Sequence, residues 1–224
     1  MPKGQKAIGC KWVYAVKRTK DGDVQKLKSR LVAKECSQRY GVNYNETFSP
    51  VVRCSNIRLV VALAVEHEIY LHQMDVSSAY LNGDLHDTVY MKQPPYFEDR
   101  NCPDKIVKLK KSLYGLKQSG REWNTKLDSV LKAIRFKPCI SDPCIYVKSE
   151  NNVYSIIVVY VDNLIVGSSS MNELCKIKRS ISSEFKVVDG GELSHFLGME
   201  FSRDGKLGAM TISQGQYIRY IGRI

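Results

Sequence analysis

The sequence lacks several features that would place the chain in common protein classes. Its seven cysteines are scattered and never spaced C-x-x-C, which argues against a zinc centre and a disulfide scaffold. No apolar run approaches the roughly 18 residues of a membrane-spanning helix. The N-terminal MPKGQKAIG has no hydrophobic segment of a signal peptide, and internal repeats and long low-complexity linkers are missing. We therefore expect reduced thiols in an intracellular protein that is not secreted.

Acidic residues are in the minority. The chain has 34 Lys and Arg against 23 Asp and Glu, a net charge of +11. This balance favours a polyanionic partner, nucleic acid first and an acidic membrane surface second, although a merely basic protein would have the same charge. With 43% hydrophobic residues, 224 residues can bury the core of one large domain or two small ones.

Alternating side chains and turn residues predict antiparallel strands in three segments. The segments, with their turns in parentheses, are 11–34 (Asp21-Gly22), 144–167 (151–152 and Asp162) and 195–213 (Asp204-Gly205). Helices are predicted over 55–68, 119–136 and 171–181, and a proline-containing loop over 92–105.

Helix capping can also be predicted. Ser55 or Asn56 is the expected cap of the first helix, and Ser170 with Glu173 forms a capping box for the third. The expected fold class is α+β, with antiparallel strands and helices packed on one face.

Two aspartates are predicted to lie at strand ends. IIVVYVDNLIV (156–166) is an apolar run, a turn carrying Asp162 and a second apolar run, and LHQMDV (71–76) ends on Asp75. Each aspartate alone could be an ordinary turn residue. If the two meet in space, their oxygen atoms can hold Mg²⁺ for phosphoryl transfer. The pair is therefore the candidate catalytic centre.

Many sequence blocks, in order, resemble the reverse transcriptases of copia-type LTR retrotransposons. The blocks are KWVY, SRLVAK, YNETFSPVVR, IRLVVALA, LHQMDVSSAYLNGDL, VYMKQPP, LKKSLYGLKQS, REW, DPCIYV, YVDN and FLGMEF. The resemblance covers nearly the whole chain. It implies a fragment of a Pol polyprotein that is an RNA-directed DNA polymerase, a nucleotidyltransferase.

The resemblance also implies an architecture. The expected fold is the right-hand polymerase fold over residues 1–224, in which helices back an antiparallel palm sheet. The implied subdomains are fingers (1–70 and 94–118), palm (71–93 and 119–203) and the start of a truncated thumb (204–224).

The resemblance further implies roles for residues around the two aspartates. Asp75 and Asp162 would be catalytic and, with the backbone carbonyl of Val76, would ligate two Mg²⁺ ions, for which Mn²⁺ could substitute. Asn163 stands where the family has the second Asp of YVDD, so one negative charge beside the metals is missing. Tyr80 would be the steric gate that selects deoxynucleotides; a plain core aromatic is the alternative.

Other residues match the family's substrate contacts. The implied nucleotide-binding residues are Arg30, Tyr80, Lys34, Gly115 and Gln118. Lys34, like the further candidate Lys20, is a weaker candidate than Arg30. The implied primer grip is Phe196, Leu197, Gly198 and Met199. A solvated basic face and a plain amphipathic hairpin are the structural alternatives. The chain departs from the family at Ser119-Gly120, which replaces Ala-Pro and should loosen the start of a helix, and at Glu35, an acidic residue near a phosphate-binding surface.

Three functional interpretations stay open. The first is a polymerase whose partners are an RNA template, a DNA or RNA primer, dNTPs and the protease, integrase and ribonuclease H domains of the parent element. It would act in cytoplasmic virus-like particles or the nucleus, without a membrane partner. The second is a remnant that folds and binds nucleic acid but does no chemistry, an interpretation that Asn163 and the abrupt end support. The third, a cellular RNA-binding or structural protein, is disfavoured by the ordered blocks.

Overall fold

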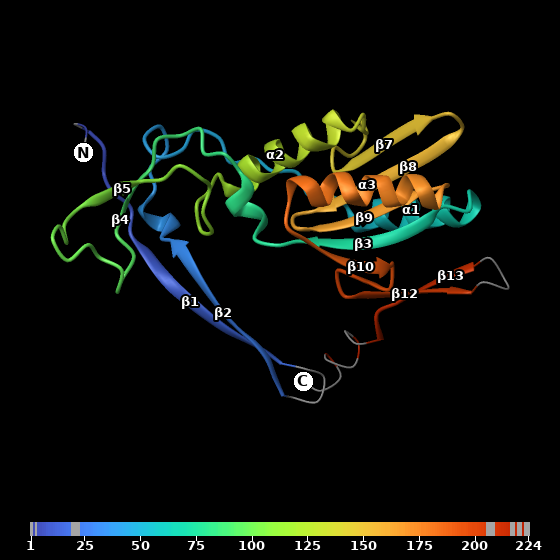
Figure 1. Ribbon diagram of the computed structural model, residues 1–224, viewed down its shortest axis with the longest axis horizontal. Coiled ribbons are helices and arrows are strands. Elements are labelled where there is room, and N and C mark those ends of the chain that lie inside the picture. Colours follow the sequence, from blue (N-terminus) through green and yellow to red (C-terminus); the bar gives the residue numbers. More distant parts are fainter. Residues whose placement is uncertain are drawn as a thin grey trace. The chain divides into compact units, whose positions relative to one another are not determined.

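Two separate stretches of sequence build each of the two units of the chain. In this computed structural model, unit 1 comprises Met1–Ser49 and Ala79–Lys126, and unit 2 comprises Pro50–Ser78 and Leu127–Ile224. The structure describes residues 2, 4–18, 23–204, 209–215, 218 and 221. Within these residues the fold is a mixture of antiparallel sheets and three α-helices (Figure 1), which confirms the predicted α+β class.

Unit 1 contains a long two-stranded ribbon and a short strand pair. Strands β1 and β2 pair from Cys10 opposite Ala33 to Arg18 opposite Val24, which confirms the first predicted hairpin. Its predicted turn at Asp21-Gly22 lies outside the described residues. The strands of unit 1 are β1 (Cys10–Arg18), β2 (Val24–Ala33), β4 (Tyr90–Lys92) and β5 (Ile106–Lys108). The β4–β5 pair was not predicted, because three-residue strands carry too little periodicity.

Short 3₁₀ helices and a small core complete unit 1. The 3₁₀ helices are η1 (Glu35–Ser37) and η2 (Ala79–Asn82). The core consists of Ile8, Cys10, Ala33, Val89, Met91 and Leu116. It fixes one end of the ribbon to the β4–β5 pair.

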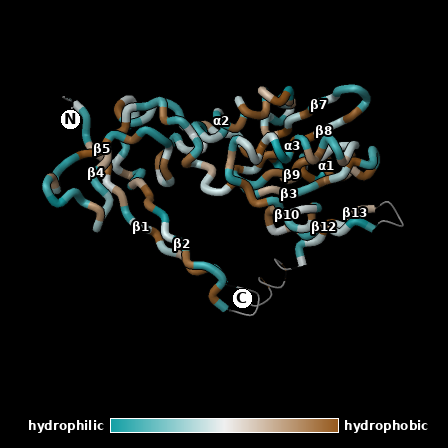
Figure 2. The backbone as a smooth tube through the Cα atoms, viewed as in Figure 1, coloured by the Kyte–Doolittle hydropathy of each residue, from teal (hydrophilic) through white to brown (hydrophobic). Residues whose placement is uncertain are grey.

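Unit 2 is built on a six-stranded antiparallel sheet (Figure 1). The strand order is β10-β3-β9-β8-β7-β6. The strands are β3 (Tyr70–Val76), β6 (Lys137–Pro138), β7 (Ile145–Glu150), β8 (Val153–Tyr160), β9 (Asn163–Ser168) and β10 (Val187–Glu192). Figure 2 shows the hydrophobic residues of β8 and β9, which are continuous because both faces of these central strands are covered.

The three strands predicted over 144–167 are β7, β8 and β9. Asn151 and Asn152, in the turn between β7 and β8, have φ angles of 50° and 61°. Asn tolerates the left-handed conformation that a two-residue hairpin turn demands, so the predicted turn is confirmed.

A second, three-stranded sheet of unit 2 has the order β11-β12-β13. Its strands are β11 (His195–Phe196), β12 (Met199–Asp204) and β13 (Ala209–Ser213). The hairpin predicted over 195–213 is confirmed, but its turn includes Gly205, which lies outside the described residues. A tighter turn at Leu197 and Gly198, with φ angles of 51° and 76°, was not predicted.

Three helices run over Cys54–Glu66 (α1), Ser119–Ala133 (α2) and Met171–Glu184 (α3). The boundary between the units falls within α2. Helix α2 buries Trp123, Leu127 and Val130 as predicted, but it ends before residue 136 because Arg135 adopts a left-handed φ of 69°. Helix α3 packs on β8 and β9. Within the described part of the chain, no helix is long and apolar enough to span a membrane.

The predicted cap of α1 is wrong. The N-cap position is Arg53, whose side chain makes no capping bond. Instead the buried carboxylate of Asp142 accepts hydrogen bonds from the Arg53 backbone N–H (3.3 Å) and the Asn56 side chain (2.7 Å). An acceptor 89 residues downstream therefore satisfies the helix start that the local sequence leaves open.

Replacing Asp142 by alanine should destabilise unit 2 by about 2 kcal/mol, since it removes the α1 cap and leaves buried donors unpaired. The midpoint of thermal unfolding, followed by circular dichroism, should fall by roughly 4–8 °C. The exposed Asp104 provides the control: Asp104→Ala should leave the midpoint nearly unchanged. Equal midpoints for the two variants would contradict the assigned cap.

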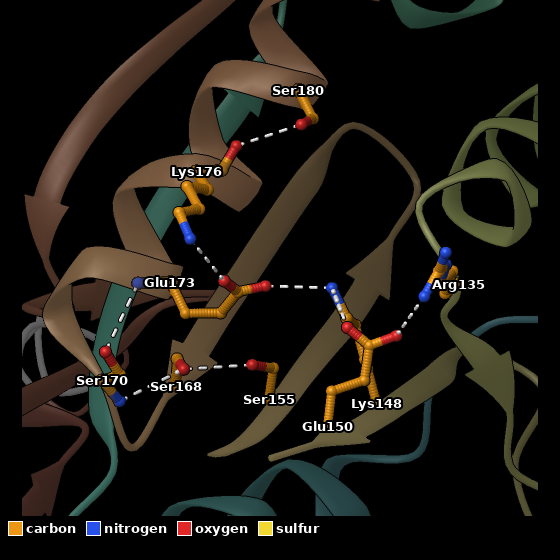
Figure 3. Close-up of polar contacts among 9 residues, drawn as sticks. All are labelled: Arg135, Lys148, Glu150, Ser155, Ser168, Ser170, Glu173, Lys176 and Ser180. Carbon is orange, nitrogen blue, oxygen red and sulfur yellow. Dashed lines mark hydrogen bonds and ion pairs between the residues drawn. The ribbon is translucent and has the colours of Figure 1, made fainter.

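Half of the predicted capping box at α3 forms. The Ser170 hydroxyl accepts the Glu173 backbone N–H at 3.5 Å, which confirms the cap. The Glu173 carboxylate does not return to Ser170; it accepts a hydrogen bond from Lys148 at 2.9 Å (Figure 3). The Ser170 N–H donates to the Ser168 hydroxyl instead. Lys148 of β7 therefore ties α3 to the sheet.

Candidate catalytic site

The structure brings the two predicted aspartates together within unit 2. Asp75 lies directly opposite Asn163 in the β3–β9 register. The backbone N–H of Val76 donates to the backbone carbonyl of Asp162 at 2.7 Å. Asp75 is exposed, and Asp162 and Asn163 are partly buried. Asp75, at the end of β3, and Asp162, in the β8–β9 turn, thus lie at the same end of the sheet's inner strands.

The turn that carries Asp162 is strained. Val161 has a φ of 55°, in the left-handed region where a β-branched side chain is an outlier. Such a conformation costs on the order of 1–3 kcal/mol and persists only where the surrounding structure imposes it. Here the continuous β8–β9 ladder, from Ser155 opposite Ser168 to Tyr160 opposite Asn163, closes the turn. The direction of Asp162 is therefore set by the sheet.

Asn163 acts directly on Asp162. Its side-chain Nδ2 donates a hydrogen bond to Asp162 Oδ1 at 3.0 Å. An aspartate at position 163 would add a carboxylate beside that of Asp162. The amide of Asn163 instead donates to Asp162 and occupies one of its lone pairs. The substitution therefore reduces the negative charge and the number of accessible oxygen ligands.

The available oxygen donors suit a hard divalent cation. Asp75 and Asp162 supply two carboxylates, and Val76 supplies a backbone carbonyl at the same strand end. Mg²⁺ and Mn²⁺ prefer such ligands. Among the residues that the structure describes, no group of three or more His, Cys, Asp and Glu side chains could hold a metal.

Lys178 of α3 links the neighbouring strands β3 and β10. The Lys178 ammonium contacts His72 Nδ1 of β3 at 3.0 Å and Asp189 Oδ2 of β10 at 2.5 Å. Burial, and then the positive charge of Lys178, lowers the pKa of His72, although Asp189 and Glu192 oppose the shift. The shift favours the neutral imidazole of His72 in the folded chain.

The lowered pKa of His72 predicts a pH-dependent contribution to stability. Below the ordinary pKa of 6.5 the unfolded chain takes up a proton that the folded chain excludes, so the contribution is present above that value and falls as the pH drops through the folded pKa. We expect the wild type to lose stability relative to His72→Gln between about pH 7 and pH 5. Unfolding midpoints of both proteins across this range check the sign. Parallel curves would contradict it.

In unit 1, a residue that sequence reasoning missed connects two predicted site residues. The Tyr80 ring lies 5.1 Å from the Tyr114 ring, edge to face, and the Arg30 guanidinium lies 5.5 Å from the Tyr114 centroid. Tyr114 belongs to the SLYGLKQS block, but no local pattern separates it from a core aromatic. It holds Tyr80 and Arg30 in one cluster.

The backbone at Gly115 packs closely against strand β2 of the same chain. Its φ is 81°, and a Cβ there would lie 2.5 Å from Val32 Cγ1 and still closer to the carbonyl oxygen of Ala33. The backbone N–H of Ala33 also donates to the carbonyl of Tyr114 at 2.8 Å. Gly115 thus allows its loop to dock on β2, while its predicted nucleotide contact stays a prediction.

Gln118 is fully buried in a polar network. Its Oε1 accepts from Gln38 Nε2 at 2.9 Å, and its Nε2 donates to the Asn43 carbonyl and to Asp87. Gln38 Oε1 accepts the Lys117 backbone N–H. In this arrangement Gln118 positions its loop, and the predicted contact with template or nucleotide stays untested. No local pattern points to Gln38 as its partner, because the two residues lie 80 positions apart.

The start of α2 is anchored, contrary to the expectation from Ser119-Gly120. The Ser119 hydroxyl donates to the Leu113 carbonyl at 2.5 Å and accepts from the Ser112 hydroxyl at 2.8 Å. Both serine side chains are buried. These bonds replace the pre-organisation that a proline would supply at the first turn.

One face of the ribbon carries Lys17, Lys26, Lys28 and Arg30. By register Val13, Ala15 and Lys17 lie opposite Arg30, Lys28 and Lys26. Slight burial and then Lys17, Arg30 and Lys26 lower the pKa of Lys28. This clustering of like charges supports an anion-binding face, as predicted for Arg30. Lys34 lies beyond the ribbon and is exposed, and Lys20 lies outside the described residues.

The predicted primer grip divides into buried and accessible residues. Phe196 and Met199 are 4% and 3% exposed and belong to the core. Leu197 and Gly198 form the β11–β12 turn and are more accessible. Of these four residues, only Leu197 and Gly198 are accessible enough to contact a primer through their side of the turn.

Comparisons with known proteins place these features in context. The sequence profile of a family described as "Reverse transcriptase (RNA-dependent DNA polymerase)" matches residues 1–223. The chain is 38% identical over 223 residues, 99% of its length, to the Retrovirus-related Pol polyprotein from transposon TNT 1-94 of Nicotiana tabacum. It is 39% identical over 94% of its length to the corresponding polyprotein from transposon RE1 of Arabidopsis thaliana. The matched region covers only 17% of the length of the first relative and 14% of the length of the second.

Proposed function

Since the chain belongs to the reverse transcriptase (RNA-dependent DNA polymerase) family of copia-type retrotransposons, we propose that it extends a primer along an RNA template by metal-assisted nucleotidyl transfer. The observation that carries the proposal is that Asp75 and Asp162 lie side by side, where β3 ends beside the β8–β9 turn. The rate is reduced by Asn163, which withdraws a charge and occupies an oxygen of Asp162.

Asp75, Asp162 and the Val76 carbonyl would hold two Mg²⁺ or Mn²⁺ ions. When bound, such ions activate the attacking hydroxyl and stabilise the leaving pyrophosphate. The protein contributes rigid placement: the Val76–Asp162 bond and the strained Val161 turn fix the two carboxylates relative to each other. Placement of this kind before the reaction lowers its barrier.

We further propose that unit 1 corresponds to the fingers and unit 2 to the palm. This assignment places α1 with the palm sheet, whereas the sequence-based bounds placed residues 1–70 with the fingers. Tyr80 would exclude a 2′-hydroxyl, and Arg30, Lys34, Gly115 and Gln118 would serve the incoming nucleotide directly or by positioning. Leu197 and Gly198 would contact the primer. Residues 204–224 would begin the thumb.

The relatives are Pol polyproteins much longer than this chain. We propose that protease, integrase and ribonuclease H domains are its partners in the parent element. The template, the primer and dNTPs are the proposed substrates. The intracellular location, in virus-like particles or the nucleus, stays a prediction, and so does the absence of a membrane partner.

A second candidate function is nucleic-acid binding without chemistry. The Asn163–Asp162 hydrogen bond favours it, because the amide engages an oxygen of Asp162, one of the two carboxylates assigned to the site. Folding and the basic surfaces are independent of this site. A remnant of this kind would bind a template–primer with or without Mg²⁺.

Primer extension on an RNA template with dNTPs and Mg²⁺ tests the proposal. We expect slow extension by the wild type and none by Asp162→Asn or Asp75→Asn, with duplex binding unchanged in both variants. Extension that persists in Asp162→Asn would contradict the assigned site. Binding without extension in the wild type, in Mn²⁺ as well as Mg²⁺, would establish the second candidate.

A further inference from the structure

Gln73 of strand β3 has no role in the site described above, although it lies two residues before Asp75. Side chains at positions i and i+2 of a strand point to the same face. Gln73 and Asp75 therefore project from β3 on the same side, with about 7 Å between their Cα atoms. His72, which contacts Lys178 of α3, lies on the other side. Gln73 thus points away from α3, toward the face on which Asp75 lies.

The side-chain amide of Gln73 binds the backbone at the start of strand β11. Its Oε1 accepts a hydrogen bond from the Ser194 N–H at 3.1 Å and another from the His195 N–H at 3.0 Å. Two donors that converge on one atom require an acceptor, so the amide oxygen, and not the amide nitrogen, must occupy this position. Gln73 thus joins β3 to a segment that lies 121 and 122 residues downstream.

A β-bulge in β10 lies beside the Gln73 side chain. The β10–β3 register shifts between Asp189 and Glu192, so that Gly190 and Gly191 both lie opposite Gln73. Such a bulge bends its strand and changes the direction in which neighbouring side chains point. The Gln73 stem packs against the bulge, since a Cβ at Gly190 would come within 2.7 Å of Gln73 Cγ. The bend thus falls where Gln73 crosses from β3 to β11.

The anchored segment leads directly to the turn that we propose to contact a primer. Strand β11 consists of His195 and Phe196, and the turn at Leu197 and Gly198 follows it. A strand pairing this short holds a turn only weakly on its own. The position of the turn relative to Asp75 therefore depends on what fixes the start of β11.

A second contact ties the same sheet to the chain just before β3, but from the other end of β12. Arg203 Nη1 donates to the Ile69 carbonyl at 3.1 Å. Arg203 lies opposite Met210 of β13, away from the turn that precedes β12. Loss of this contact would loosen the sheet without releasing its turn from Gln73. Arg203 therefore allows the role of Gln73 to be separated from general docking of the sheet.

We propose that Gln73 is a positioning residue that fixes the Leu197-Gly198 turn beside the face of β3 from which Asp75 projects, and thereby sets where the 3′ end of a primer lies. The proposal rests on the proposed function, in which this turn contacts the primer. Gln73 acts through the backbone of Ser194 and His195. A merely structural role would hold the sheet without affecting the place of the primer end.

Two substitutions separate the acceptor oxygen of Gln73 from the volume of its side chain. Gln73→Met keeps the length and removes the acceptor, whereas Gln73→Glu keeps an acceptor oxygen. Arg203→Met is the matched control. Amide hydrogen exchange, followed by nuclear magnetic resonance, should be about tenfold or more faster at Ser194 and His195 in Gln73→Met than in the other proteins. Equal exchange rates would overturn the assigned hydrogen bonds. Circular dichroism verifies that each variant folds.

The place of the primer end is measured without chemistry. The probe is a primer–template duplex with the fluorescent base 2-aminopurine at the primer 3′ end, whose emission depends on its stacking. We expect the emission of the bound duplex to shift in Gln73→Met and to match the wild type in Gln73→Glu and Arg203→Met. The dissociation constant of the duplex should stay within about twofold in all variants. Faster amide exchange without a shift at the primer end would overturn the positioning role.

Extension kinetics distinguish this inference from the polymerase proposal. In the Asn163→Asp background, Gln73→Met should lower kcat by about tenfold or more and change KM for the primer–template by less than about twofold. Gln73→Glu and Arg203→Met should keep kcat within about twofold. Extension by Gln73→Met at the background rate would overturn the role of Gln73 and leave the activity standing. If no variant extends, the activity is contradicted, and the emission of the primer end still decides the role of Gln73.

Discussion

Replacing Asn163 by aspartate is expected to raise the rate of Mg²⁺-dependent primer extension by about 10²–10³-fold, the usual worth of one preorganised electrostatic group. The variant restores a negative charge beside Asp75 and removes the donor that occupies Asp162 Oδ1. It should also lower the Mn²⁺ dissociation constant by about tenfold or more, which electron paramagnetic resonance measures on the protein alone.

Asn163→Ala separates the two effects of this substitution. It removes the amide donor without adding charge, so it should recover little of the rate if the missing charge dominates. A gain in Asn163→Ala as large as in Asn163→Asp would assign the impairment to the hydrogen bond. Equal Mn²⁺ affinities and equal extension rates in the wild type and Asn163→Asp would contradict a role for this position.

The largest effect on stability is expected from Gly115→Ala. The new Cβ would enter a left-handed backbone position and collide with the Ala33 carbonyl and Val32. Left-handed strain and overpacking each cost on the order of 1–3 kcal/mol, and we expect a combined loss of about 3 kcal/mol or more. Both tryptophans, Trp12 and Trp123, belong to unit 1, so urea unfolding followed by their fluorescence reports the change.

Gly41→Ala is the matched control. Gly41 has a φ of 73°, close to that of Gly115, but a Cβ there would meet nothing within 4 Å. The control therefore carries the backbone strain alone, about 1 kcal/mol. If both variants lose the same stability, the docking of the Gly115 loop on β2 contributes nothing measurable.

Local patterns of the sequence were enough to predict much of the sheet. Alternation and turn residues located β1, β2 and the β7–β8–β9 meander, since their hydrogen-bond partners are neighbours in sequence. The same patterns placed Asp75 and Asp162 at strand ends. That the two meet requires β3 to pair with β9, and this pairing was expected only because the sequence blocks resemble a known family.

The features that could not be predicted depend on partners far away in the sequence. Asp142 caps a helix from 89 residues downstream, and Gln38 fixes Gln118 from 80 residues upstream. Helix propensity describes only the segment in which a residue lies, so Ser55 and Asn56 were the best local candidates for the cap. For the same reason Ser119-Gly120 was expected to weaken the start of α2. The partners of the Ser119 hydroxyl, Ser112 and the Leu113 carbonyl, are identified only in the folded chain.

The ribbon formed by β1 and β2 has only two strands, and Tyr14, Val16 and Leu27 remain largely exposed on the face opposite its cations. An isolated two-stranded hairpin is marginally stable in water. The core of unit 1 holds only one end of the ribbon, so we expect the rest to exchange with less ordered forms that do not present its cations together. A measured affinity for a phosphate ligand is then the intrinsic affinity multiplied by the ordered fraction. Substitutions on the apolar face could tighten binding without touching the ligand.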